Sequence, residues 1–145
     1  MRYVIDASVA IRWFVKDFSH RNADYVLDVM VREPERFCVP ELFLYEVYSV
    51  LHRHHPYANR VFANDVERIL RSGVLRYPMT ENIYTRANRF IQMGLTGYDT
   101  VYIALAEELD GKWLTFDSKA HALVQDEGLS IDLFSSSIKV EGLEK

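Results

Sequence analysis

The stretch RYVIDASVAIRWFV (residues 2–15) determines much of the predicted fold, because a strand, an acid and a helix follow one another directly in it. Residues 2–5 are β-prone and run into Asp6. The apolar side chains of residues 9–15 then suit a helix. A strand that ends at an acid and is followed at once by a helix indicates an α/β protein, in which helices connect the strands of a sheet.

Strand and helix signals alternate along the rest of the chain. Gly and Pro occur singly, where elements would end, and no repeat or linker interrupts the pattern. Strands separated by one or two helices predict a three-layer α/β/α sandwich with a central, mainly parallel sheet. The predicted strands are 2–5, 36–39, 74–77, 112–116 and 131–133, and the predicted helices are 9–15, 19–31, 40–55, 59–72, 80–93, 96–109 and 118–125.

The composition is that of one compact domain. With 145 residues, 49% of them apolar, the chain can bury a sizeable core, and we expect one domain over 1–134 and a C-terminal tail over 135–145. No apolar run approaches the roughly 20 residues that span a membrane, and no secretory signal is recognisable, so a cytoplasmic protein without membrane contact is expected. The single cysteine, Cys38, excludes an intramolecular disulfide and is expected to be buried.

The formal net charge of −4 argues against a protein that binds nucleic acid through its overall electrostatic field. Any contact with RNA would therefore be local. Two basic edges are candidates for such a contact, and solvated surface charge is the alternative for both. One edge contains Arg12 and Lys16, and the other contains His52, Arg53, His54, His55 and Arg60.

Three aspartates share one kind of position, at a predicted strand end or in the first turn of a predicted helix: Asp6, Asp99 and Asp117. In an open α/β sheet, ligands bind outside the carboxyl ends of the strands, so Asp6 and Asp117 are expected to face one crevice. Asp99 could join them from a helix start. Helix capping is the structural alternative for each, because Asp is a favoured cap and Thr96 with Asp99 has the spacing of a capping box.

Glu46 is a fourth candidate, within the helix predicted over 40–55. There Leu42, Glu46 and Val50 share one face, so the carboxylate belongs to an otherwise apolar stripe. A buried charge without a partner costs several kcal/mol, and a cation would compensate it. The alternative is that Glu46 lies at the edge of the stripe and reaches solvent or an arginine.

If the four acids meet, their mutual repulsion raises their pKa values until a multivalent cation neutralises them. A set of oxygen ligands favours Mg²⁺ or Mn²⁺ over zinc. For phosphodiester cleavage, such a site would activate a water molecule and stabilise the charge that grows on the phosphate.

Four segments resemble, in the same order, the signature blocks of the PIN-domain family, and in particular of its VapC-type toxin ribonucleases. They are VIDASVAIRWFV (4–15), VPELFLYEVYSVL (39–51), GYDTVYIALAEEL (97–109) and WLTFDSKAH (113–121), and together they span most of the chain. The family usually has a small residue two places after the glutamate, where this chain has Tyr48, and frequently Asn at the next position, where it has Ser49. This departure concerns how the helix packs or presents substrate and leaves the acids unchanged.

The resemblance implies that Asp6, Glu46, Asp99 and Asp117 bind the metal and carry catalysis, and that Ser8 supports the first carboxylate or the water shell of the metal. It implies an endoribonuclease that uses Mg²⁺ or Mn²⁺ and is the toxin of a type II toxin–antitoxin pair. An RNA substrate, a VapB-type antitoxin and a homodimer are the expected partners.

Further residues could assist such a site. Arg12, Lys119 and His121 are candidate substrate contacts, with solvated helix surface as the alternative for the last two. Five aromatic side chains at helical positions are expected to lie in the core rather than to stack on bases: Trp13, Phe14, Phe43, Tyr45 and Tyr48.

Three other functions are alternatives to a toxin. A PIN nuclease could process RNA outside a toxin–antitoxin pair, or a PIN fold could persist as a binding module without catalysis, although the presence of all four acids argues against the second. A phosphoacceptor domain that uses Mg²⁺ would need paired acids directly after the first strand, where only Asp6 stands.

Overall fold

The computed structural model describes residues 1–135, and its centre is a five-stranded sheet with the strand order β3-β2-β1-β4-β5. Every neighbouring pair of strands is parallel. The strands are β1 (Tyr3–Ile5), β2 (Phe37–Pro40), β3 (Leu75–Tyr77), β4 (Lys112–Thr115) and β5 (Ser130–Asp132). Apart from Ser135, the expected C-terminal tail lies outside the described residues.

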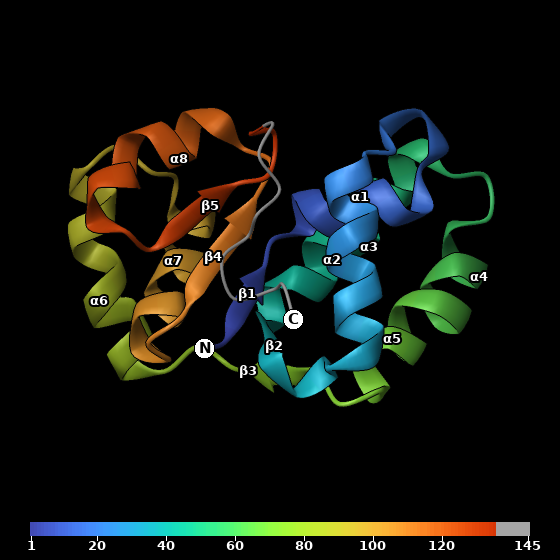
Figure 1. Ribbon diagram of the computed structural model, residues 1–145, viewed down its shortest axis with the longest axis horizontal. Helices are drawn as coiled ribbons and strands as arrows, with labels where there is room; N and C mark the ends of the chain where they lie inside the picture. Colours follow the sequence, from blue (N-terminus) through green and yellow to red (C-terminus); the bar gives the residue numbers. More distant parts are fainter. Residues whose placement is uncertain (136–145) are drawn as a thin grey trace.

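Helices cover both faces of the sheet, which confirms the three-layer α/β/α sandwich (Figure 1). The helices from α1 to α5 lie on one side and those from α6 to α8 on the other. Their bounds are α1 (Ala7–Phe14), α2 (Arg21–Arg32), α3 (Glu41–His54), α4 (Ala58–Val61), α5 (Glu67–Arg71), α6 (Glu81–Gln92), α7 (Gly97–Glu108) and α8 (Ser118–Val124). Short 3₁₀ turns occupy Lys16–Phe18, Pro34–Arg36 and Gln125–Glu127.

The prediction of one regular helix over 59–72 is wrong in its middle. A π-helical turn, Phe62–Val66, separates α4 from α5. Neither Gly nor Pro marks this turn in the sequence, so no local signal predicts it. Tertiary packing accompanies it, since Val66 is buried and the Phe62 ring lies edge-on to Tyr48 of α3, with 5.5 Å between ring centroids.

The strand order reverses its direction between β1 and β4, where a crevice at the carboxyl edge of the sheet is expected. From β1 the chain proceeds to β2 and β3 in one direction, whereas from β4 it proceeds to β5 in the opposite direction. The connections therefore leave β1 and β4 towards opposite faces, and the point between two such strands is where open α/β sheets bind ligands. Because β1 and β2 are buried along their whole length, they appear in the sequence as continuous apolar runs rather than as an alternating pattern.

The core confirms some of the predicted interior positions. Cys38 is buried in β2, and its Sγ donates a weak hydrogen bond to the carbonyl oxygen of Tyr3 at 3.5 Å. Phe43 is buried too, whereas Tyr45 and Tyr48 on the same helix are exposed, so the prediction that these tyrosines belong to the core is wrong. They lie on the outer side of α3, since the buried face of that helix is formed by Phe43, Leu44, Val47 and Leu51. Within residues 1–135, no helix is both long and apolar enough to cross a membrane.

Gly111, between α7 and β4, is required by a close backbone approach. A Cβ atom at this position would overlap the carbonyl oxygen of Arg2, which accepts a hydrogen bond from the Lys112 amide. We expect Gly111→Ala to lower the free energy of unfolding by about 1–3 kcal/mol, as overpacking does elsewhere. Urea unfolding of Gly97→Ala is the matched control, because a Cβ atom there meets nothing within 4 Å. Equal losses in both variants would contradict the explanation.

Candidate functional site

Two of the candidate acids directly follow neighbouring strands. Asp6 comes after β1, and Asp117 comes two residues after the end of β4. The backbone amide of Asp6 donates to the carbonyl oxygen of Leu114 at 3.1 Å, which continues the β1–β4 pairing up to the acid. Both aspartates therefore lie at the carboxyl edge of the sheet, beside the crevice between β1 and β4.

Asp6 is buried, with 6% of its surface exposed, and although it stands at the N-cap position of α1, its side chain makes no cap hydrogen bond. Its Oδ2 atom instead accepts two hydrogen bonds, from Ser8 Oγ at 2.9 Å and from Thr115 Oγ1 at 2.6 Å. Capping, the structural alternative considered for this residue, is thus absent. Among the described residues, no donor is recorded for the other carboxylate oxygen, Oδ1, which leaves it available to a ligand.

The two hydroxyl groups that hold Asp6 are themselves held by the loop after β4. Ser8 Oγ accepts a hydrogen bond from the Phe116 amide at 3.0 Å, and Thr115 Oγ1 accepts one from the Asp117 amide at 2.9 Å. Each hydroxyl thus donates to the carboxylate and accepts from the backbone, which defines its orientation. The position of Asp6 is thereby tied to the segment that carries Asp117. The sequence reasoning missed Thr115, although a polar residue in a buried strand just before an acid is a usable signal.

Glu46, on α3, is half-buried and bonded to the opposite helical layer. Tyr102 Oη, from α7, donates to Glu46 Oε1 at 2.6 Å. The Tyr102 ring is buried and stacks on Trp113 of β4, with 6.3 Å between ring centroids. Glu46 therefore lies at the margin of the buried face of α3 and is oriented by a rigid phenol. No local pattern of residues predicts this role for Tyr102, because its partner lies 56 residues away in the chain.

Asp99 and Asp117 each lie at the start of a helix, and hydrogen bonds of the helix caps help to position them. Thr96 caps α7 and accepts a hydrogen bond from the Asp99 amide at 3.2 Å. Asp117 caps α8, because its Oδ1 accepts from the Ala120 amide at 3.0 Å. Capping is thus confirmed for Asp117, yet it occupies one oxygen only and leaves the second carboxylate oxygen for other contacts.

The four acids share one electrostatic environment. Burial is the main cause that raises the pKa of Asp6 to about 7; the hydrogen bonds from Thr115 and Ser8 oppose this, and the charges of Asp99 and Glu46 add to it. Burial likewise raises the pKa of Glu46, with a further increase from Asp99. It also raises the pKa of Asp99, with a further increase from Asp117. Each acid is therefore coupled to at least one other.

The donor chemistry of this group fits a hard divalent cation, which prefers carboxylate oxygens and offsets like-charge repulsion. The positions are not those of a preformed site. Within residues 1–135, no three carboxylate, imidazole or thiol side chains lie close enough together to hold one ion as they stand. A shared ion would thus require the side chains to rotate towards one another. Repulsion among ionised carboxylates favours such separation until a cation is bound.

A scan against protein-family models matches residues 3–125 to the PIN domain, which is most of the chain. The chain belongs to the PIN domain family. The matched region contains all four acids and the hydroxyl residues that orient Asp6. Comparison with curated protein sequences gives no match.

Solved structures share the PIN fold at low sequence identity. A toxin–antitoxin complex from Klebsiella pneumoniae matches with a TM-score of 0.62 and 19% identity, covering 83% of this chain and 90% of that one. PAE2754 from Pyrobaculum aerophilum matches with a TM-score of 0.65 and 19% identity, covering 92% and 90%. VapC20 from Mycobacterium tuberculosis, a sarcin–ricin loop cleaving toxin, matches with a TM-score of 0.57 and 13% identity, covering 83% and 93%. Identities this low establish a likeness of fold alone.

Of the three candidate substrate contacts of this PIN domain, Arg12 and His121 contact other side chains or the backbone, and Lys119 is exposed. The Arg12 guanidinium lies over the rings of Phe116 and Phe134, 4.1 Å and 4.8 Å from their centroids, and its Nη1 donates to the carbonyl oxygen of Phe18 at 3.1 Å. His121 Nδ1 lies 2.7 Å from Ser130 Oγ, on β5. Lys119 is exposed on α8. These contacts hold Arg12 and His121 in place, and a role in substrate binding stays a prediction for all three residues.

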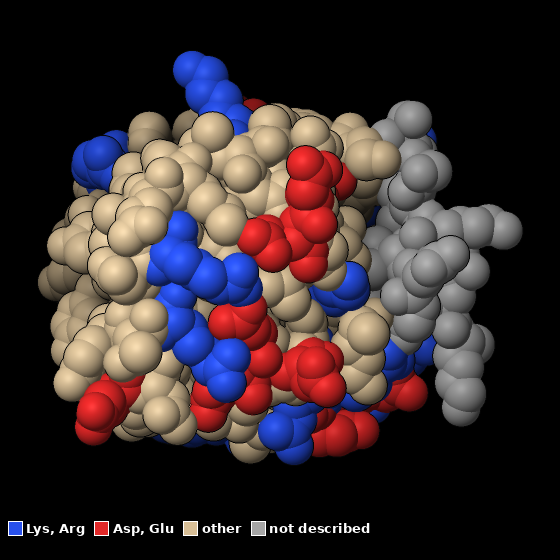
Figure 2. All heavy atoms as spheres, turned by 90° about the vertical axis from the view of Figure 1, so that its left-hand side faces the viewer, with Lys and Arg blue, Asp and Glu red and all other residues tan. Residues whose placement is uncertain are grey.

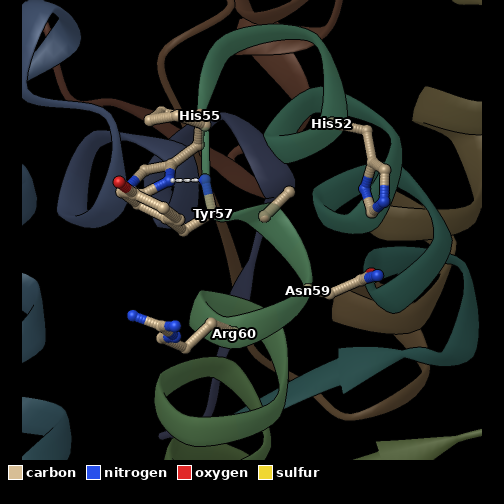
Figure 3. A pocket seen from close by; sticks show the side chains of 7 residues that line it. His52, His55, Tyr57, Asn59 and Arg60 are labelled. Atoms are coloured by element: carbon tan, nitrogen blue, oxygen red, sulfur yellow. Dashed lines mark hydrogen bonds between the residues drawn. The ribbon is translucent and has the colours of Figure 1, made fainter.

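The second basic edge surrounds a separate pocket at the end of α3. His52, His55, Tyr57, Asn59 and Arg60 line it, but the side chains do not converge (Figure 3). His52 lies on one side, whereas His55 lies beside Tyr57 and accepts a hydrogen bond from its amide at 3.0 Å. The Arg60 guanidinium lies over the Tyr57 ring, 5.3 Å from its centroid.

The face formed by α6 to α8 offers no continuous basic surface. Figure 2 shows acidic and basic side chains intermixed there. Arg86 pairs with Glu107 at 3.1 Å and with Glu108 at 2.6 Å, and Arg89 pairs with Glu107 and, at 3.4 Å, with Glu127. The charges of Arg86 and Arg89 are thus neutralised locally.

Proposed function

We propose that this PIN domain is a metal-dependent endoribonuclease that hydrolyses RNA phosphodiester bonds with Asp6, Glu46, Asp99 and Asp117 as its metal-binding and catalytic acids. The observation that carries the proposal is the electrostatic coupling of these acids at the carboxyl edge of the sheet. A fold does not by itself determine an activity, so the argument depends on the site. Here the buried carboxyl group of Asp6 makes no cap hydrogen bond and, among the described residues, no ion pair, so its ionisation is unfavourable unless a cation is bound.

The protein residues have separable roles in this proposal. Ser8 and Thr115 orient Asp6 through Oδ2, so that Oδ1 would be the atom that binds the metal. Tyr102 holds Glu46 in the same way from the other helical layer. A bound Mg²⁺ or Mn²⁺ would supply Lewis-acid stabilisation of the phosphate charge and lower the pKa of a water molecule. Asp6 is buried, Glu46 and Asp99 are half-buried and Asp117 is exposed, so the group extends from the interior to the surface, where a phosphate could reach it.

We further propose that the domain is the toxin of a VapBC-type pair, acts in the cytoplasm, forms a homodimer and is inhibited by a VapB-type antitoxin. The likeness in fold to the Klebsiella pneumoniae toxin–antitoxin complex and to the toxin VapC20 supports this part of the proposal. Expression of the wild-type chain alone should then arrest bacterial growth, and co-expression of the protein encoded directly upstream should restore it. Normal growth with an active nuclease would instead favour a PIN nuclease that processes RNA outside such a pair.

Incubation of the purified protein with a structured RNA tests the enzymatic part. We expect internal cleavage in Mn²⁺ or Mg²⁺, none in EDTA, and restoration when the metal is returned. An Asp99→Asn variant should bind Mn²⁺ more weakly in calorimetry and cleave correspondingly less, because one coupled carboxylate is removed. Cleavage that persists in EDTA, or a chain that leaves RNA intact with every divalent metal, would overturn the assignment.

A further inference from the structure

A pocket of about 330 Å³ opens directly beside the acids, between α3 and the start of α7. One stripe of α3 contributes Leu42, Glu46 and Val50 to its lining, and Arg53 lies one further turn along that helix. The wall from α7 is Tyr98, which immediately precedes Asp99. The pocket therefore shares Glu46 with the proposed catalytic group and adjoins a second of its acids.

Two tyrosines from separate elements line this pocket and are exposed. Tyr45 on α3 is 72% exposed, and Tyr98 on α7 is 64% exposed. Within the described part of the chain, neither ring makes an aromatic contact with another side chain that would explain its position. Exposure of a large aromatic ring to water is unfavourable in the unbound protein. Aromatic faces are also the surfaces on which unpaired nucleobases stack.

The charges around the pocket favour a nucleotide strand as its occupant. Arg53 is the cation among the lining residues, and seven residues of helix place it about 10 Å along α3 from Glu46. That spacing allows one phosphate to lie at the acids while a neighbouring phosphate of the same strand lies near Arg53. Because the protein has a net charge of −4, its overall field does not draw RNA in, and stacking supplies affinity that does not depend on that field.

We propose that this pocket binds one unpaired nucleobase of the RNA strand to be cleaved, stacked on Tyr45 and Tyr98, with Arg53 contacting a flanking phosphate. This inference rests on the proposed nuclease function and deepens it, because it names the substrate class. Bases inside a duplex are already stacked and cannot enter such a pocket, so loops, bulges and single strands are selected over paired RNA.

Equilibrium binding of a short single-stranded RNA with 2-aminopurine tests the inference. All variants carry Asp6→Asn, so that the RNA stays intact in Mg²⁺. Tyr45→Ala and Tyr98→Ala are each expected to weaken binding by roughly five- to 150-fold. They should also reduce the quenching of 2-aminopurine, whereas Tyr45→Phe and Tyr98→Phe should retain both. Replacement of Arg53 by Gln should lower the slope of log affinity against log salt by about 0.7.

The matched control is Tyr84→Ala, which removes a tyrosine of similar exposure, 57%, from α6, outside the residues that line the pocket. It should bind as the parent does, and every variant should prefer single strands to the corresponding duplex. If both alanine variants at the pocket bind RNA unchanged, the inference is overturned. A pocket that binds a side chain of a protein partner instead of a nucleobase would give this result.

The two proposals fail in distinguishable ways. If the wild-type chain cleaves RNA and the pocket variants bind RNA as their Asp6→Asn parent does, the pocket inference fails and the nuclease function stands. If the tyrosines are needed for binding but the wild-type chain cleaves nothing with Mn²⁺, the nuclease function fails and the base-binding pocket stands.

Discussion

Replacing Asp6 by asparagine is expected to lower metal-dependent RNA cleavage by about a thousandfold or more. Metal assistance contributes several kcal/mol to such a reaction, and each 1.36 kcal/mol is about tenfold in rate. Asparagine keeps the shape of the side chain, and its carbonyl oxygen can still accept the hydrogen bonds from Ser8 and Thr115. The substitution therefore removes the charge while the surrounding contacts remain.

Initial rates with a fluorogenic RNA, measured across a range of Mn²⁺ concentrations, check this expectation. The matched control is Asp126→Asn, which removes an exposed acid from the turn after α8 and should cleave as the wild type does. Far-UV circular dichroism should show that both variants are folded. Cleavage by Asp6→Asn within tenfold of the wild-type rate would exclude Asp6 from the proposed metal-binding group.

In metal-free buffer, the wild-type protein is expected to lose stability as pH rises from about 4 to about 7, and Asp6→Asn should lose less. The pKa of Asp6 rises from its ordinary value of 3.8 to about 7 in the folded protein, chiefly because the side chain is buried. Between these values the folded state binds more protons than the unfolded state, so the free energy of unfolding falls as pH increases. The contribution of protonated Asp6 is complete below pH 3.8 and is lost as pH passes through 7.

The magnitude of this effect is at most roughly 4 kcal/mol, since a tenfold change in proton affinity corresponds to about 1.4 kcal/mol. Urea unfolding in EDTA at pH 5, 6, 7 and 8 measures it as the difference between Asp6→Asn and the wild type. That difference should be smallest at pH 5 and largest at pH 8, where the neutral variant is the more stable protein. Carboxylates elsewhere in the chain affect both proteins and cancel. A difference that does not vary with pH would contradict the burial of an ionisable Asp6.

Added Mn²⁺ should reverse this order at pH 8. A ligand that binds only the folded state stabilises it in proportion to the logarithm of its concentration above Kd. The wild type should gain stability from the ion, and Asp6→Asn should gain less. In the metal-free protein, the ionised Asp6 is thus expected to lower stability, and a bound ion is expected to restore it. Charged functional sites commonly destabilise the protein that carries them.

Local features of the sequence predicted most of the fold. Strands before Asp6 and before Asp117, and caps such as Thr80 and Thr96, depend on neighbouring residues only, and the structure has strands and helices there. The signals failed where packing between distant segments overrides local preference. The π-helical turn at Phe62–Val66 and the exposure of Tyr45 are of this kind, because helical periodicity does not reveal which face of a helix a neighbour covers.

The sequence by itself determined the α/β class, the order of its elements and the identity of the four candidate acids, since periodicity, caps and motifs are properties of short segments. Only the tertiary structure decided how those acids are held. Thr115 reaches Asp6 across 109 residues of chain and Tyr102 reaches Glu46 across 56, and the pocket between α3 and α7 joins Tyr45 to Tyr98. Such contacts depend on how the sheet and helices pack, and no local pattern of residues encodes that packing.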